Sequence, residues 1–295
     1  MNPVIHTEEL TKRYGRKPAL TGLDLDVPAG TLFGYLGPNG AGKTTTIRIF
    51  AGLLRPTSGR ATVLGADVVA DRETVQSRIG YLPGDFVAYP DLTAAEYLRY
   101  MGNLRGGVDQ ASTTRLAKRL DLHLDEAIGA MSHGNRQKVG IVQAFQHDPE
   151  LLVLDEPTQG LDPLVQHEFL TMLREARQAG KTVFLCSHVL SEVEAVADTV
   201  AILRQGQLVE VASVAELKAK ALRRLDLTFD ERVPLDLLRA VPGVTEIHAN
   251  GSGVQLAVEG STAELLAVAA PYRITSVVSH EPDLEEIFLT YYGKA

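Results

Sequence analysis

Short apolar runs separated by turns containing Gly and Pro dominate the first part of the chain. This pattern predicts strands at residues 4–6, 23–27 and 31–36. A helix is predicted at 43–51, with Gly52 ending it. A further strand is expected at 78–82.

From residue 91 to 149 the periodicity becomes helical. Thr93 and Glu96 form a T-x-x-E capping box, which predicts a helix start. Two more helices are predicted at 111–120 and 132–146.

Buried strands return after residue 150, at 151–155, 182–187 and 199–203. Between the first two, Asp162 is placed to cap a helix that has Pro163 at its first position and ends at Gly180. Strands that alternate with helices predict a mostly parallel sheet with crossover helices. The block 91–149 is then a helical insertion in that sheet.

The pattern changes again near residue 212. Ser213 and Glu216 form another capping box and open a short helix. The strands and helices predicted after it follow the order β-α-β-β-α-β, which is typical of a ferredoxin-like fold. They lie at 224–229, 234–240, 244–249, 253–258, 262–269 and 273–279, and an amphipathic helix follows at 281–292.

Composition limits the partners and the cellular compartment that this chain is expected to have. The net charge of −8 provides no overall basic field, so no nucleic-acid partner is expected. The single cysteine, Cys186, lies in an apolar run and is predicted to be a buried thiol, which suits a reducing compartment. The N-terminal residues have no basic segment followed by an apolar one, so no secretory signal is predicted, and no window approaches the length of a membrane span.

The strongest chemical signal is the sequence GPNGAGKTT at residues 37–45, which matches G-x-x-x-x-G-K-[ST]. Glycines let the backbone N–H groups wrap around a polyphosphate, and the following helix adds its N-terminal dipole. Lys43 is expected to reach the β- and γ-phosphates of ATP, and the Thr44 hydroxyl to bind Mg²⁺. The predicted ATP-binding residues of the loop are Asn39, Gly40, Ala41, Gly42, Lys43, Thr44 and Thr45.

A second signal is the run LLVLDEP at 151–157. Four aliphatic residues place Asp155 and Glu156 at the carboxyl end of a strand, where ligands bind in doubly wound sheets. Asp155 is predicted to hold the Mg²⁺ shell, and Glu156 to act as general base on the attacking water. The structural alternative, an acidic strand end that caps the next helix, is less favoured beside a phosphate-binding loop.

With these motifs in place, residues 1 to about 215 resemble the ATP-binding-cassette (ABC) ATPases. The run MSHGNRQK at 131–138 is similar to the family's LSGGQ signature, with Ser132, Gly134 and Asn135 at three of its positions. Three further motifs match in order: Tyr14 as the aromatic that stacks on adenine, 158–162 as the D-loop, and His188 as the switch histidine.

The resemblance implies a mechanism in which two copies pair head to tail. ATP then lies between the phosphate-binding loop of one copy and the signature residues of the other, and Ser132 at a helix start is suited to face a γ-phosphate. His188 is implied to contact the γ-phosphate and to hold the geometry around Glu156, so these two are the candidate catalytic residues.

Several positions depart from the family pattern. Gly84 stands where the family usually has a glutamine, which removes a side-chain oxygen for Mg²⁺ or water, so that coupling to a partner must use Asp85, backbone or water. His133 replaces a glycine, Asn135 replaces the last glutamine of the signature, and Gln159 replaces a D-loop serine. With the C-terminal extension, these departures resemble an export-type subgroup of ABC subunits.

The sequence therefore predicts an α/β fold: a P-loop ABC ATPase domain at 1–215, with an antiparallel β subdomain, and an α+β ferredoxin-like domain at 224–295 for regulation or dimerisation. The implied function is ATP hydrolysis that drives a separate membrane-spanning permease. The subunit is expected at the cytoplasmic side of the cell membrane, attached through that permease. Two alternatives stay open: a soluble cassette ATPase without a membrane partner, and a module that senses ATP without hydrolysing it.

Overall fold

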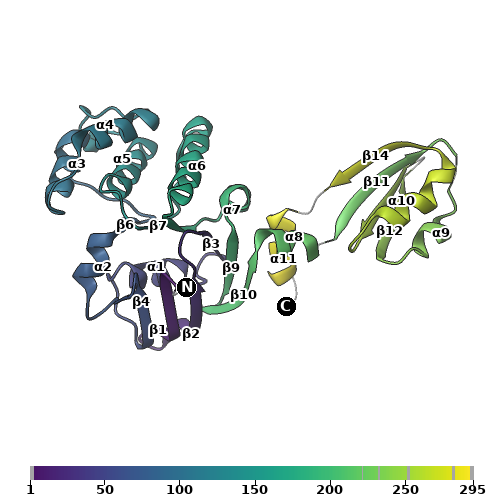
Figure 1. Cartoon of the computed structure of the whole chain (residues 1–295), viewed down its shortest axis with the longest axis horizontal. Coiled ribbons are helices and arrows are strands. Elements are labelled where there is room, and N and C mark those ends of the chain that lie inside the picture. The colour runs from purple at the N-terminus through teal and green to yellow at the C-terminus, as the bar shows by residue number, and fades with distance from the viewer. Residues whose placement is uncertain (1–2, 221, 232, 251–252, 281–282, 293–295) are drawn as a thin grey trace. The chain divides into compact units, whose positions relative to one another are not determined.

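The computed structural model describes residues 3–220, 222–231, 233–250, 253–280 and 283–292. The chain forms two compact units, Met1–Val211 and Ala212–Ala295 (Figure 1). Each unit has its own hydrophobic core. Within the described residues, no helix combines the length and the apolar character that crossing a bilayer requires.

The first unit is built on a six-stranded sheet in the order β10-β9-β3-β8-β7-β6. The pairs β3–β8, β3–β9, β7–β8 and β6–β7 are parallel, which confirms the predicted parallel sheet. Every residue of β3, β7 and β8 is buried, as expected for strands covered on both faces. The strands are β3 (Leu32–Leu36), β6 (Ile79–Leu82), β7 (Leu151–Asp155), β8 (Thr182–Cys186), β9 (Thr199–Arg204) and β10 (Gln207–Ser213).

A second sheet in the order β2-β1-β4-β5 forms the predicted antiparallel subdomain. The sequence pattern indicated only short strands at 4–6 and 23–27, whereas the structure has long ones. Bulges between Thr7 and Leu10 and between Leu10 and Lys12 break the alternation of apolar residues, and Glu9 has a φ of 45°. The strands are β1 (Ile5–Tyr14), β2 (Lys17–Val27), β4 (Ser58–Val63) and β5 (Ala66–Asp67).

Helices predicted from caps begin where the caps placed them. Thr93 and Glu96 form the full capping box, and Asp162 caps a helix with Pro163 in its first turn. The Ser132 hydroxyl accepts a hydrogen bond from the Asn135 N–H at 3.2 Å. The helices are α1 (Lys43–Phe50), α2 (Arg72–Arg78), α3 (Ala94–Asn103), α4 (Gln110–Arg119), α5 (His133–Phe145), α6 (Pro163–Gln178) and α7 (Leu190–Val196), with a 3₁₀ turn at Ile128–Ala130.

An aromatic cluster anchors the helix that follows the glycine loop. Phe184 on β8 stacks on Phe33 and meets the ring of Phe50 edge-on, with centroids 5.4 Å apart in the second pair. The hydroxyls of Tyr35 and Thr46 lie 3.1 Å apart in the interior. Since Thr46 and Phe50 belong to α1, the core fixes this helix against one face of the sheet.

The second unit has the predicted β-α-β-β-α-β order. Its antiparallel sheet runs β12-β13-β11-β14, the strand order of a ferredoxin-like fold. The helix α8 packs against α11, and the predicted start of that last helix, Glu281, lies outside the described residues. The elements are α8 (Val214–Lys220), β11 (Arg223–Phe229), α9 (Leu235–Arg239), β12 (Val244–Asn250), β13 (Gly253–Val258), α10 (Ala263–Ala269), a 3₁₀ turn (Ala270–Tyr272), β14 (Ile274–His280) and α11 (Leu284–Tyr292).

Candidate active site

The loop between β3 and α1 is closely packed against neighbouring backbone. Gly42 precedes α1 with a φ of 112°, and a Cβ atom there would lie 2.5 Å from the carbonyl oxygen of Ala19. Both the left-handed backbone and the close approach require glycine at this position. The first N–H groups of α1, at Lys43 and Thr44, therefore have no partner within the helix and can face a ligand.

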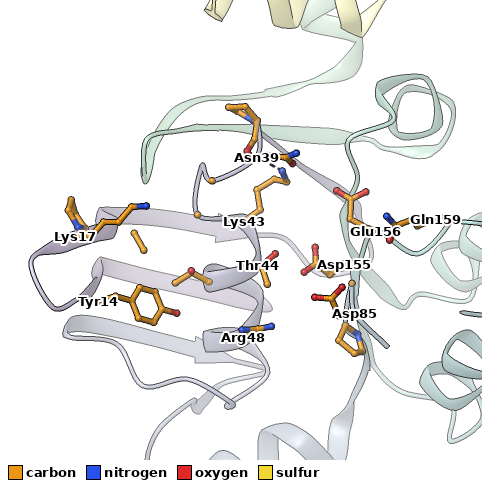
Figure 2. Close-up of a pocket in the computed structure, with 18 of the residues that line it drawn as sticks. Tyr14, Lys17, Asn39, Lys43, Thr44, Arg48, Asp85, Asp155, Glu156 and Gln159 are labelled. Atoms are coloured by element: carbon orange, nitrogen blue, oxygen red, sulfur yellow. Dashed lines mark hydrogen bonds between the residues drawn. The ribbon is translucent and has the colours of Figure 1, made fainter. Parts of the chain in front are cut away.

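Lys43 begins α1 and is almost fully buried. Its Nζ donates hydrogen bonds to the carbonyl oxygens of Gly37 at 2.6 Å and Pro38 at 3.3 Å. These bonds hold the ammonium group against the backbone of the loop, close to the positive end of the helix dipole (Figure 2). An anionic polyphosphate is the chemical group that suits this combination.

Asp155 ends β7 and is 2% exposed. Burial raises the pKa of its carboxyl above the usual value, while hydrogen bonds with the Thr44 hydroxyl and the Cys186 thiol lower the pKa. A hydroxyl and a carboxylate thus meet at the carboxyl edge of the sheet. Oxygen donors of these two kinds are what Mg²⁺ prefers in proteins.

Glu156 leaves the strand in a left-handed conformation, with a φ of 50°. This backbone costs about 1–2 kcal/mol for a residue with a Cβ, and a hydrogen bond from the Glu156 N–H to the Cys186 carbonyl, at 2.9 Å, helps to hold it. The turn directs the Glu156 carboxylate out of the strand and toward the pocket (Figure 2). Strain of this kind is common at functional sites.

His188 contacts the same carboxylate. Its Nδ1 lies 2.5 Å from Glu156 Oε2, and its backbone N–H donates to the same oxygen at 3.2 Å. Because β7 and β8 are parallel neighbours, the residues that follow them meet at one edge of the sheet. The two candidate catalytic residues are therefore brought into direct contact.

A pocket of about 410 Å³ lies beside these side chains. Of the predicted site residues, Tyr14, Asn39, Gly40, Gly42, Lys43, Thr44, Thr45, Asp155 and Glu156 line it, whereas His188 is not among the lining residues and Ala41, within the loop itself, is buried. Tyr14 is half-exposed at the tip of the β1–β2 hairpin, with Lys12 Nζ 5.5 Å from its ring centroid. The antiparallel subdomain thus supplies an aromatic face to one side of the pocket (Figure 2).

The signature residues Ser132, Gly134 and Asn135 are not among the residues that line this pocket. They lie at the start of α5, where Gly134 and the neighbouring His133 pack on Gly160 of the D-loop in the same chain. A Cβ atom on Gly134 would lie 2.3 Å from the carbonyl oxygen of Gly160. The signature and the D-loop therefore have a fixed mutual position.

Several site residues were not identified from the sequence. Lys17, Arg48 and Tyr81 line the pocket, but surface cations and a strand tyrosine carry no motif signal. Glu192 on α7 accepts a hydrogen bond from the Thr158 hydroxyl at 2.6 Å, which ties the D-loop to the segment after His188. Burial raises the pKa of Glu192 above its usual value.

Known proteins share both sequence and fold with the chain. The family profile of the ABC transporters matches residues 20–159. The bacitracin transport ATP-binding protein BcrA of Enterococcus faecalis is 38% identical over 74% of this chain and 71% of its own length. The daunorubicin/doxorubicin resistance ATP-binding protein DrrA of Streptomyces peucetius is 35% identical over 98% of this chain and 92% of its own.

The chain belongs to the ATP-binding subunits of ABC transporters. A solved ATP-binding subunit of an ABC transporter is 30% identical, with a TM-score of 0.68 over 73% of this chain and 92% of its own. A bacterial Atm1-family ABC exporter with ATP bound is 27% identical, with a TM-score of 0.67 over 73% of this chain and 40% of its own.

Membership of the ABC family confirms the predicted fold class and the predicted ATPase activity. The parallel sheet, the antiparallel subdomain and the helices between β6 and β7 are the parts of this ABC fold. In this ABC subunit, the phosphate-binding loop, the carboxylates at the end of β7 and Tyr14 of the β1–β2 hairpin line one pocket.

Proposed function

We propose that this chain is the ATP-hydrolysing subunit of an ABC exporter, and that two copies of it dimerise around two ATP molecules. The observation that carries the proposal is the convergence of Lys43, Thr44, Asp155 and Glu156 on one pocket. Two relatives named for resistance, DrrA and the linearmycin resistance protein LnrL of Bacillus subtilis, favour export.

Mg²⁺ fits the residues that are present. The Thr44 hydroxyl and the Asp155 carboxylate already contact each other, and burial makes an unpartnered charge on Asp155 costly. We assign these two residues to the cation, which when bound would neutralise charge on the phosphates. Lys43 and the loop N–H groups hold the phosphates, and Tyr14 stacks on the adenine.

Glu156 is proposed as the base that orients and deprotonates the attacking water. Its contact with His188 supports a pairing in which the imidazole holds the carboxylate in place and then contacts the γ-phosphate. Ser132, Gly134 and Asn135 of one copy are proposed to complete the site of the other, because their helix start exposes N–H groups to a phosphate.

The substitution Glu156→Gln tests this assignment. It keeps the size and one acceptor oxygen of the side chain but removes the base, so ATP turnover is expected to fall by about 100- to 10,000-fold. ATP binding should persist, and an ATP-bound dimer should accumulate in size-exclusion chromatography. Normal turnover in this variant would show that another group is the base.

The surface for a membrane-spanning partner is proposed at the loop after β6. This loop touches the nucleotide pocket through Gly84 and Asp85 and then exposes Val87 and Tyr89, which are 83% and 56% exposed. Tyr100 on α3 lies against Tyr89, with ring centroids 6.0 Å apart. Exposed apolar side chains that adjoin the nucleotide pocket suit a partner that must sense it.

A single added cysteine can test this surface, because Cys186 is the only native one and is fully buried. Val87→Cys, carrying a photo-crosslinker in whole cells, should capture an integral membrane protein from the cytoplasmic face. Leu53→Cys, at a residue that is 57% exposed just after the C-terminal end of α1, serves as the control. Equal capture at both positions, or capture of no membrane protein, would contradict this docking surface.

A further inference from the structure

The backbone conformation at residue 84 does not require the glycine found there. The φ angle of Gly84 is not positive, and a Cβ atom at this position would lie 3.5 Å from the Asp155 carboxylate, which is an ordinary contact. Other glycines of the unit differ: at Gly80 a Cβ atom would lie 2.1 Å from the carbonyl of Ala144. A larger side chain at position 84 is therefore sterically possible and would reach the cation-binding edge of the pocket.

Asp85, the next residue, carries the side chain that this segment presents to the pocket. It lines the same cavity as Asp155 and Glu156, and its carboxylate points into that cavity (Figure 2). Three carboxylates from two adjacent parallel strands thus face one volume, because β6 and β7 end at the same edge of the sheet.

Lys17, Lys43 and Arg48 line the same pocket, and Lys43 is committed to the phosphate-binding loop through its bonds to Gly37 and Pro38. A divalent ion that enters with the nucleotide would add to this positive charge, and the affinity of oxygen sites for hard cations rises with the number of carboxylates. Asp85 adds one such carboxylate at the position next to the missing side chain.

We propose that Asp85 supplies to the nucleotide-bound divalent cation the side-chain oxygen that residue 84 lacks. This inference rests on the proposed nucleotide site. Asp85 would then position the cation, and the charge of Asp85 would link the loop 83–93 to cation binding. The same loop carries Val87 and Tyr89, so cation binding and partner contact meet within four residues.

The test measures cation binding without hydrolysis. Mn²⁺ replaces Mg²⁺, and its binding in the presence of ATP is followed by electron paramagnetic resonance in the Glu156→Gln background. Asp85→Ala, which removes the side-chain oxygens, should weaken Mn²⁺ binding by about 10- to 100-fold. Asp91→Ala, at an exposed acid of the same loop outside the pocket, should leave binding unchanged.

A second substitution supplies the rescue. Gly84→Gln added to Asp85→Ala returns a side-chain oxygen at a position where the backbone accepts a side chain, and it should restore Mn²⁺ binding to within about threefold of the parent. Failure of this rescue would overturn the proposal, because the loss of a distant charge would then explain the weakening.

The reference for the nucleotide site itself is Asp155→Ala. If this variant loses Mn²⁺ while Asp85→Ala binds it normally, the proposal for Asp85 is wrong and the proposed function stands. If neither variant loses Mn²⁺, the cation site has been placed wrongly and both fail. Thermal unfolding of each variant identifies any misfolded protein, and Asp85→Leu, which keeps the shape of the side chain without its oxygens, then replaces Asp85→Ala.

Discussion

The contact between the signature helix and the D-loop gives a prediction whose size follows from the structure. In Gly134→Ala, the new methyl group would lie 2.3 Å from the carbonyl oxygen of Gly160, about 1 Å short of an ordinary contact. The neighbour is backbone, so no flexible side chain can yield. Either the start of α5 or the D-loop must shift by about that amount.

Two opposing terms set the effect on stability. Overpacking costs about 1–3 kcal/mol, and replacing glycine by alanine in a helix returns up to about 1 kcal/mol. We therefore expect a net loss of about 0–3 kcal/mol in the free energy of unfolding, equal to a thermal midpoint lowered by no more than about 12 °C for a unit of this size.

The effect on catalysis should be much larger. Gln159 in the D-loop lines the nucleotide pocket, and a displacement of about 1 Å can reduce a rate by about 100-fold. The assay is steady-state ATP hydrolysis beside nucleotide binding and thermal unfolding. Gly84→Ala is the steric control for stability, because its methyl group meets Asp155 at 3.5 Å. Wild-type turnover in Gly134→Ala would refute the packing argument.

Three further predictions concern single side chains. Burial raises the pKa of Asp155, so its charge destabilises the fold at pH values above that raised pKa. At pH 7 without metal, Asp155→Asn should therefore unfold at a higher temperature than wild type. This difference should shrink as the pH is lowered through the raised pKa, because the wild-type carboxylate then becomes protonated. Glu192→Ala leaves the buried Thr158 hydroxyl without its acceptor and should cost about 1–3 kcal/mol in chemical denaturation, whereas Glu192→Gln, which keeps an acceptor, should cost less. Tyr14→Ala should weaken ATP binding by about 1–3 kcal/mol in calorimetry, and Tyr14→Phe should not.

Much of the fold follows from local sequence signals. The order of strands and helices in the second unit was predictable because each strand alternates and each helix is bounded by turn residues. Helix starts at Thr93, Ser132 and Asp162 were predictable because a cap is a contact between residues close in sequence. The β1–β2 ribbon was predicted too short, because its bulges interrupt the alternation.

The sequence by itself determined the family, the phosphate-binding loop and the types of side chain proposed to carry the chemistry, because each is encoded in a contiguous motif. Only the tertiary structure decided which side chains meet. The pairing of parallel strands from distant parts of the chain brings His188 onto Glu156 and Asp85 into the pocket of Asp155. Contacts between residues far apart in sequence leave no local pattern, so Arg48, Glu192 and the fit of Gly134 against Gly160 became visible only in the folded chain.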